Sequence, residues 1–339
     1  MESIMALQRK IVPELVSLMQ ERYTLLQHVH VHQPIGRRAL AESANLTERH
    51  VRGEIDFLHG QGLVEVTSKG MFITNEGKVV LDQLAALIGD LSRLENLEDQ
   101  LKSTLSIDNV IVVPGDSDHN PQMKAEMGKA CVTYLQSMLQ NDNTVAVTGG
   151  STIAAVAEAM KPLPEGTDIL FVPARGGIGE KVENQASRIV SEMARRSNSQ
   201  YRMLYVPDPI SDSTYELIMQ EPHVIDALTV IKNADIVIHG VGDALRMAER
   251  RRSPQEVIDL LKSEQAVSEA FGYYFDVDGR IVYKVKTVGL QLEDIDASKQ
   301  VITVAGGTSK GHAITSYFKQ GKSNMLITDQ GAAEKILRG

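Results

Sequence analysis

The chain has 339 residues, 42% of them apolar, which exceeds what one compact core usually holds and predicts two domains. Its formal charge of −9 excludes a protein that coats nucleic acid or anionic membrane over its whole surface, although one small domain can still carry a basic face. A single cysteine, Cys131, excludes an internal disulfide framework and fits a reducing compartment.

The N-terminal stretch predicts no targeting segment. "MESIMALQRKIVPEL" lacks the basic start, the apolar core and the cleavage site of a signal peptide. No run in the chain approaches the ~20 apolar residues of a membrane span. We therefore expect a cytoplasmic protein with no membrane partner.

The first predicted element is a helix over residues 14–32, which Pro34 ends. Its apolar residues fall near one face, as in a core helix: Leu15, Leu18, Met19, Leu26 and Val29. His28, His30 and His32 alternate at a spacing of two, which sends neighbouring rings to opposite sides of a helix. We therefore predict no metal site, and no Cys/His cluster elsewhere has zinc spacing.

Residues 35–77 predict a winged helix-turn-helix. A short helix from Gly36 to Ser43 meets the turn "ANL", and a second helix follows, which the hydroxyl of Thr47 can cap. A buried seam between the two helices is expected from Ile35, Leu40, Ala44, Leu46, Val51, Ile55 and Leu58. "LVEVT" and "GMFIT" then alternate as a small hairpin, the wing.

The second helix of this module is the candidate for insertion into a DNA major groove. Arg49 and Arg52, near its start, are the side chains best suited to read guanine, and wing residue Lys69 would lie near phosphates. The full predicted DNA-contacting set is Arg37, Arg38, Thr47, Arg49, His50, Arg52 and Lys69. Between Gly36 and Lys78 six acidic residues balance six basic ones, so a protein-docking role stays open as the alternative.

A long helix is expected after the wing. Apolar residues recur there at gaps of three or four, namely Val80, Leu84, Leu87, Leu91, Leu94, Leu97 and Leu101. Such a stripe can pack on the following domain or pair with a second copy, and we expect a homo-oligomer, a dimer or a tetramer. The predicted boundaries are 1–77 for the DNA-binding domain, 78–105 for the linker helix and 106–339 for an effector domain.

From residue 109 onward, short apolar runs alternate with helical segments. The runs are "NVIVV", "TVAVT", "DILFVP", "RMLYVP", "DIVIH", "QVITVA" and "NMLIT". Runs of Val, Ile and Leu without polar alternation are typical of strands buried on both faces, as in a parallel sheet covered by helices. The sequence therefore predicts a Rossmann-like three-layer α/β/α domain, whose ligand would lie at the carboxyl ends of the strands.

Two loops at these strand ends have the composition of anion sites. Gly149, Gly150, Ser151 and Thr152 follow "TVAVT", where glycines admit an anion to backbone amides and the next helix directs its positive end inward. "GGTSKGHAI" repeats this chemistry and adds Lys310. Neither a Walker motif nor G-x-G-x-x-G is present at the first loop, which disfavours nucleotide hydrolysis and dinucleotide binding.

Basic and polar side chains accompany the two loops. Arg175 follows "DILFVP", and Arg246 and Arg250 share one helical face after "DIVIH". We expect a small molecule with two phosphates, or with one phosphate and other polar groups. Gln185 and Glu269 can bond its hydroxyls, although a solvated surface carboxylate is an equal alternative for Glu269.

The winged helix followed by "AVTGGSTIAAVAEAM", "FVPARGGIGEKVENQA", "EAFGYYFDVDGRIVYKV" and "VAGGTSKGHAI" resembles the SorC family of sugar-responsive bacterial transcription regulators. The resemblance implies a repressor of a lower-glycolysis operon that includes glyceraldehyde-3-phosphate dehydrogenase, released when fructose 1,6-bisphosphate binds the C-terminal domain. It also implies a C-terminal fold similar to sugar-phosphate isomerases and deaminases, with operator DNA as the partner and no cofactor besides the effector.

Matching the family's motifs gives the ligand-binding set Gly149, Gly150, Ser151, Thr152, Arg175, Gln185, Arg250, Glu269 and Lys310. The related enzymes use an Asp, His and Glu set for proton transfer, and we find no convincing counterpart beside these loops. The chain is therefore expected to bind without turnover. A sugar-phosphate enzyme with an appended helix-turn-helix is the alternative, with Glu269 or His312 as a weak candidate base.

Overall fold

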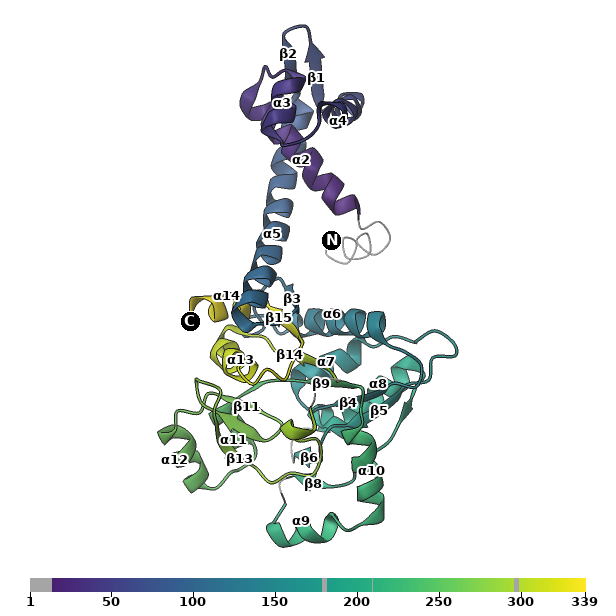
Figure 1. The fold of residues 1–339 in the computed structure, drawn as a ribbon, viewed down its shortest axis with the longest axis vertical. Coiled ribbons are helices and arrows are strands. Elements are labelled where there is room, and N and C mark those ends of the chain that lie inside the picture. The colour runs from purple at the N-terminus through teal and green to yellow at the C-terminus, as the bar shows by residue number, and fades with distance from the viewer. Residues whose placement is uncertain (1–13, 179–181, 209, 296–298) are drawn as a thin grey trace. The chain divides into compact units, whose positions relative to one another are not determined.

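The computed structural model describes residues 14–178, 182–208, 210–295 and 299–339, and the chain divides between Arg93 and Leu94 into two compact units (Figure 1). Each unit has an apolar core of its own. None of the helices within the described ranges has the length and apolar character needed to cross a membrane.

The first unit is the predicted winged helix-turn-helix. Its elements are α2 (Glu14–His32), α3 (Arg37–Ser43), α4 (Glu48–Gly60), β1 (Val64–Thr67) and β2 (Gly70–Ile73). The hydroxyl of Thr47 accepts a hydrogen bond from the His50 amide at 3.3 Å, which confirms the predicted cap of α4. The two strands pair antiparallel, with Val64 opposite Ile73, and form the wing.

The core of this unit follows the predicted seam. Leu40, Val51, Ile55 and Leu58 are buried, and Ile35 joins them through a backbone bridge to the wing. The predicted core face of α2 is wrong at its start. Leu15 is 38% exposed, and the buried part of this helix comprises Leu25, Leu26 and Val29, the stretch that packs on the seam.

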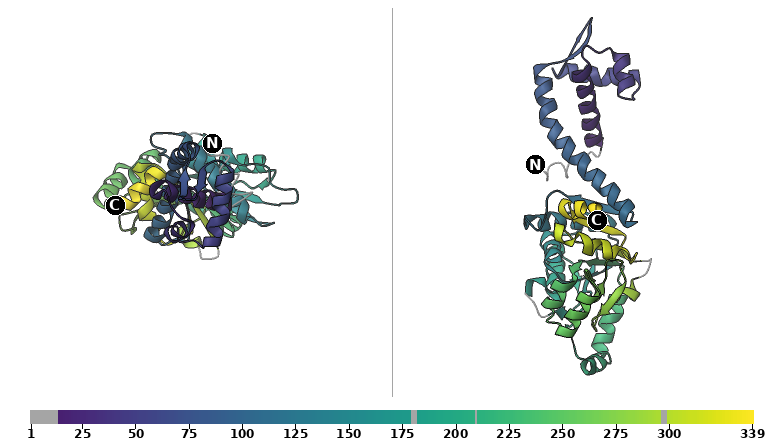
Figure 2. Two further views of the ribbon diagram at one scale, coloured as in Figure 1. Left: turned by 90° about the horizontal axis from the view of Figure 1, so that it is seen from above. Right: turned by 90° about the vertical axis from the view of Figure 1, so that its left-hand side faces the viewer.

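The long helix predicted after the wing is α5 (Asn75–Leu105), the long blue helix in Figure 2. Near its C-terminus, Leu97 and Leu101 are buried in the core of the second unit, so this part of the stripe packs on the following domain. Val80 and Leu84 are half-buried. The side chains of Leu87 and Leu91 lie outside the described residues.

The second unit contains a seven-stranded sheet in which every neighbouring pair is parallel. Its strands, in spatial order, are β3 (Asn109–Val113), β15 (Met325–Asp329), β14 (Gln300–Val304), β9 (Ile236–His239), β4 (Thr144–Val147), β5 (Leu170–Pro173) and β7 (Gln200–Tyr201). Six of the seven predicted runs supply these strands. The chain order reverses between β4 and β9, so their C-terminal loops flank a topological switch point.

The run "RMLYVP" is the exception. The seventh strand is the two-residue β7, and Arg202–Val206 has no strand assignment. Leu204 and Val206 are buried while Tyr205 is 89% exposed, so this segment buries alternate side chains against the surface of the sheet domain. A strand within the sheet would bury both faces.

Helices cover both faces of the sheet, as the three-layer prediction requires. The helices α6 (Gln122–Met138), α7 (Ser151–Ala159) and α8 (Ala186–Ser197) supply the core on one face. The helices α10 (Pro222–Lys232), α13 (Gly311–Phe318) and α14 (Gln330–Arg338), with the end of α5, supply the other. Figure 1 labels both groups.

The sequence patterns did not predict a second, antiparallel sheet that is built onto this unit. Its strands are β10 (Gly242–Asp243), β11 (Ser268–Ala270), β12 (Tyr273–Phe275) and β13 (Ile281–Lys284). The helices α11 (Ala244–Arg250) and α12 (Gln255–Ser263) pack beside it around Ala248, Leu261 and Tyr274. The remaining short elements are β6 (Gly177–Ile178), β8 (Pro207–Asp208), α9 (Asp212–Ile218) and the 3-10 turns Val182–Asn184, Leu292–Asp294 and Thr308–Lys310.

Candidate functional site

A cavity lies at the carboxyl ends of β4, β5, β9 and β14, at the switch point of the parallel sheet. The antiparallel sheet contributes Glu269 from β11 to its wall. The structure brings all nine predicted ligand-binding residues to this cavity: Gly149, Gly150, Ser151, Thr152, Arg175, Gln185, Arg250, Glu269 and Lys310. They come from segments up to 161 positions apart in the chain, so their convergence is a property of the fold.

The loop after β4 is built to expose the N-terminus of α7. Gly150 has a φ of +124°, a conformation that favours glycine, and the space beside it is empty. Gly149 packs so closely on the Asn184 carbonyl that a Cβ atom there would lie 2.7 Å from the carbonyl oxygen. No side chain caps α7 and no acidic residue lies in its first turn, so its positive end is open toward the cavity.

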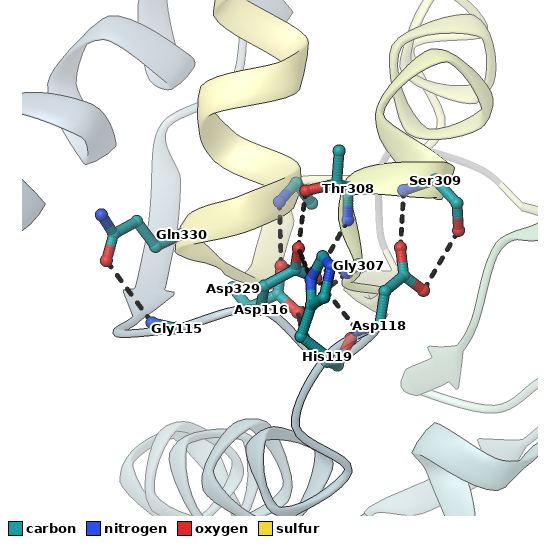
Figure 3. A network of polar contacts seen from close by, with 11 residues as sticks. Gly115, Asp116, Asp118, His119, Gly307, Thr308, Ser309, Asp329 and Gln330 are labelled. Atoms are coloured by element: carbon teal, nitrogen blue, oxygen red, sulfur yellow. Dashed lines mark hydrogen bonds and ion pairs between the residues drawn. The ribbon is translucent and has the colours of Figure 1, made fainter.

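The loop after β14 differs from the prediction of a second phosphate cradle. Carboxylates of the protein already accept from its donors (Figure 3): Asp329 from the Gly307 amide at 2.8 Å, Asp116 from the Thr308 hydroxyl at 2.7 Å, and Asp118 from the Ser309 amide at 2.7 Å. These amides and hydroxyls are therefore engaged inside the protein, and of this loop only Lys310 lines the cavity.

The close approach of these carboxylates also explains why the loop contains glycines. A Cβ atom at Gly306 would lie 2.6 Å from a carboxylate oxygen of Asp329, and one at Gly307 would lie 2.7 Å from a carboxylate oxygen of Asp118. Burial alone would raise the pKa of Asp116, but hydrogen bonds from the Asp118 amide, Thr308 and His119 lower it to about 2. Asp116 is thus an ionised acceptor at neutral pH.

A buried charge network forms the opposite wall. The Arg251 guanidinium donates to Glu269 Oε1 at 2.6 Å and to the Tyr274 hydroxyl at 2.8 Å. The Gly272 amide donates to the same Glu269 oxygen at 2.7 Å, and a guanidinium nitrogen of Arg175 lies 3.6 Å from it. All three charged side chains are nearly fully buried, so Glu269 holds two cationic groups in place beside the cavity.

This network corrects the surface interpretation of Glu269, which is 5% exposed. Burial would raise its pKa, but the charges of Arg251 and Arg175 and the hydrogen bonds from Arg251 and Gly272 lower it below the ordinary value. A carboxylate held ionised in this way is a poor proton acceptor, which weakens its candidacy as a catalytic base.

Arg251 was missed by the sequence reasoning. The helical spacing that singled out Arg246 and Arg250 left the next arginine unassigned. Arg251 lies just past the end of α11, is 5% exposed and lines the cavity, whereas Arg246 is exposed and does not line it. The only signal was the run "ERRRS", in which any of three arginines could have faced inward.

Lys310 and Arg250 are the other cationic residues of the lining. Lys310 is half-buried, and burial together with the charges of Lys124 and Arg250 lowers its pKa to about 8, while Asp118 and Asp329 act in the opposite direction. Arg250 is exposed at the cavity rim. A cation with a lowered pKa beside further cations is stabilised by a bound anion.

In the first unit, the predicted DNA-contacting residues fall into two groups. Arg49, Arg52 and Lys69 are exposed, and none of them forms an ion pair with another residue of the described ranges. Arg49 and Arg52 lie in the first half of α4, and Lys69 lies at the turn of the wing. This group can meet a polyanion without breaking an internal pair.

The second group is engaged with acidic neighbours. Arg37 pairs with Asp56 at 3.3 Å, Arg38 pairs with Glu42 at 3.3 Å, and a ring nitrogen of His50 lies 2.6 Å from a carboxylate oxygen of Glu21 on α2. These are exposed or half-exposed pairs, which phosphate groups can compete for at low cost.

Glu21, His50 and Glu54 bring possible metal-ligand atoms within 4.8 Å of one another. The Glu54 carboxylate already accepts a charge-assisted hydrogen bond from Arg22 at 2.7 Å. We therefore interpret this cluster as an ion-pair network on the flank of α4.

Comparison with known proteins assigns each of the two units to a protein family. Residues 90–338 match the protein family described as "Putative sugar-binding domain", and residues 18–88 match the family described as "CggR N-terminal DNA binding domain". The chain is 50% identical over 339 residues to the central glycolytic genes regulator of Priestia megaterium and 46% identical over 338 residues to that of Bacillus subtilis. Both alignments cover 100% of this chain and 99% of the relative.

Solved structures of regulators resemble this chain as well. A transcriptional regulator from Enterococcus faecalis, assigned to the SorC family, is 42% identical with a TM-score of 0.68, over 71% of this chain and 99% of that one. The full-length sorbitol operon regulator SorC from Klebsiella pneumoniae has a TM-score of 0.68 at 16% identity, over 92% of this chain and 96% of that one, which is a likeness of fold alone.

These matches decide between the open alternatives. The first unit is a DNA-binding domain, so the protein-docking alternative is set aside, and the second is a sugar-binding domain. The relatives are transcription regulators, and this chain is a regulator rather than an enzyme. Matched from end to end, the chain belongs to the central glycolytic genes regulators, within the SorC family of bacterial sugar-binding transcription regulators.

Proposed function

We propose that the chain is a repressor of a glycolytic operon, the one that includes glyceraldehyde-3-phosphate dehydrogenase, and that fructose 1,6-bisphosphate releases it from operator DNA in the cytoplasm. The relatives' name, which refers to central glycolytic genes, supports the target. The observation that carries the effector assignment is the convergence of nine residues suited to phosphates and hydroxyls on one cavity.

The charge of the cavity favours a bisphosphate over a monophosphate. Arg175, Arg250, Arg251 and Lys310 line it with a single carboxylate, Glu269, which leaves a net charge of +3 among the described lining residues. Each phosphate ester carries about −1.5 to −2 at neutral pH, so a bisphosphate brings about −3 to −4. A monophosphate would leave at least one cationic group without compensation.

Within the cavity, one phosphate is assigned to the loop Gly149–Thr152 and the open end of α7, with Lys310 beside it. Arg175 and Arg250 are assigned to the other charged oxygens. Gln185 and Glu269 are assigned to the sugar hydroxyls, since each offers an acceptor oxygen at the cavity wall.

Release from the operator requires that the ligand bind two states of the protein with different free energies, because equal affinity would shift nothing. We propose that these are two assembly states of a homo-oligomer, a dimer or a tetramer. One of them presents paired α4 helices to two half-sites. The helix α5 begins directly after the wing and ends before β3, so one continuous element carries residues of both units. Arg49 and Arg52 are the proposed base-reading residues, and Arg37, Arg38, Thr47, His50 and Lys69 are the proposed supporting DNA contacts.

A thermal-shift screen of glycolytic intermediates tests the effector. At equal ligand concentration, a ligand that binds only the folded state raises the melting temperature more the more tightly it binds, and fructose 1,6-bisphosphate should give the largest rise. Fructose 6-phosphate and fructose 1-phosphate, with one phosphate each, serve as matched controls and should give smaller rises. A larger rise with either monophosphate would contradict the bisphosphate assignment.

A further inference from the structure

Lys124 is a cationic residue that no sequence pattern singled out, and it lies at the proposed phosphate site. Its Nζ atom donates a hydrogen bond to the Ser151 hydroxyl at 3.1 Å. Ser151 is the first residue of α7 and lines the cavity. Lys124 itself is half-buried near the start of α6.

Close packing of α6 on α7 explains how this lysine arrives there. Gly128, one turn after Lys124, approaches the backbone of Ala155, one turn after Ser151, and a Cβ atom at Gly128 would lie 2.5 Å from the Ala155 carbonyl oxygen. The two contacts, 124 with 151 and 128 with 155, share one offset, so the helices run side by side in the same direction. Because Gly128 removes the side chain between them, Lys124 reaches the open end of α7.

Lys124 adds positive charge to a site that is already cationic. It lies at the positive end of α7, and its charge, together with that of Arg250 from α11, disfavours the protonated form of Lys310. Asp118 and Asp329 face Lys310 and offset part of this repulsion, but both carboxylates already accept hydrogen bonds from the loop after β14. Three cationic side chains and a helix N-terminus thus converge beside one open cavity.

We propose that Lys124 is a phosphate-contacting residue of the effector site, which completes the anion subsite at the N-terminus of α7. This inference rests on the proposed function, because it takes the ligand to be a sugar phosphate. When a phosphate oxygen enters, the ammonium group donates to it. The Ser151 hydroxyl, whose oxygen accepts from Lys124 in the structure, donates its own hydrogen as a second donor. The subsite then offers Lys124, Lys310 and the α7 amides to one dianionic phosphate group.

The test compares Lys124→Gln with Lys124→Arg in the full chain, by calorimetric titration with fructose 1,6-bisphosphate. Glutamine keeps a donor for Ser151 and removes the charge, whereas arginine keeps the charge. Losing a charged hydrogen-bond donor should weaken binding by about tenfold to a hundredfold in Lys124→Gln. Lys124→Arg should stay much closer to wild type. The control is Lys129→Gln on the same helix, an exposed lysine paired with Glu126 at 2.7 Å, which should bind as wild type does.

The pH profile supplies a readout that a merely structural role would not change. Removing the charge of Lys124 should raise the pKa of Lys310 and move the midpoint of the affinity-versus-pH curve upward, and Lys129→Gln should leave it in place. If the wild-type chain binds fructose 1,6-bisphosphate and Lys124→Gln matches it in affinity and midpoint, the role of Lys124 is overturned and the effector proposal stands. If the wild-type chain binds neither fructose 1,6-bisphosphate nor inorganic phosphate, the effector proposal and this inference are overturned together.

Discussion

Raising the pH from 7 to 9 should weaken the binding of fructose 1,6-bisphosphate through the deprotonation of Lys310. In the ligand-free protein, burial and the neighbouring cations lower the pKa of Lys310 to about 8. A bound phosphate dianion favours the protonated form and raises that pKa, so binding takes up a proton wherever the free lysine is neutral. Affinity is therefore full below pH 8 and is lost as the pH rises above it.

The magnitude follows from this pKa. Lys310 is mostly protonated at pH 7 and mostly neutral at pH 9, so the dissociation constant should rise about tenfold between them, or about 1.4 kcal/mol. The ligand contributes no titration of its own in this range, because the second pKa of a phosphate ester is about 6. The pH dependence of the stability of the ligand-free protein has the opposite sign. The unfolded lysine binds more protons, so the free energy of unfolding should rise between about pH 8 and the ordinary lysine pKa of 10.5.

Calorimetry at pH 7, 8 and 9, in pairs of buffers with different ionisation enthalpies, measures both affinity and proton uptake. Uptake should approach one proton at pH 9 and be close to zero at pH 7. Lys310→Met should bind more weakly and lose this pH dependence. Equal affinity at pH 7 and 9 in the wild-type chain, with no proton uptake, would refute the assignment of Lys310 to a phosphate.

Four further substitutions test the rest of the account. Arg175→Ala removes a buried charged donor from the cavity and should weaken fructose 1,6-bisphosphate binding by about 1.5 to 3 kcal/mol, so unchanged affinity in calorimetry would retire that contact. Glu269→Gln leaves two buried guanidinium groups without their carboxylate and should lower the free energy of unfolding of the ligand-free chain by about 3 kcal/mol, and a loss near zero in urea unfolding would contradict the network. Arg49→Ala should relax the preference for particular bases. Lys69→Ala should instead weaken DNA binding evenly across sequences and reduce by about one the slope of log affinity against log salt concentration. A specificity profile measured at several salt concentrations separates the two effects.

Much of the fold could be predicted because its signals are local. Runs such as "NVIVV" and "DIVIH" became strands because uninterrupted Val and Ile suit a sheet buried on both faces. The hydroxyl of Thr47 and the alternating wing residues likewise act over a few positions. The run "RMLYVP" failed because its alternate burial depends on which surface the segment crosses, and a short apolar run does not specify that.

The sequence predicted nine of the residues that line the cavity, but it did not predict the hydrogen bonds around it. Strand-end loops of glycine, hydroxyl and basic residues identified the cavity, since parallel strands direct their carboxyl ends to one edge. The partners of Thr308 and Ser309 are Asp116 and Asp118, about 190 positions earlier, and no local pattern connects them. Lys124 was missed for a similar reason, because its position depends on the packing of α6 against α7.

The central claim is that occupancy of the cavity controls DNA binding. Fluorescence anisotropy of a labelled promoter fragment from the glyceraldehyde-3-phosphate dehydrogenase operon, titrated with the full chain with and without millimolar fructose 1,6-bisphosphate, measures it directly. The account predicts tight or cooperative binding that the effector weakens in the wild-type chain but much less in Arg175→Ala. Operator binding that is unaffected by the effector would contradict it.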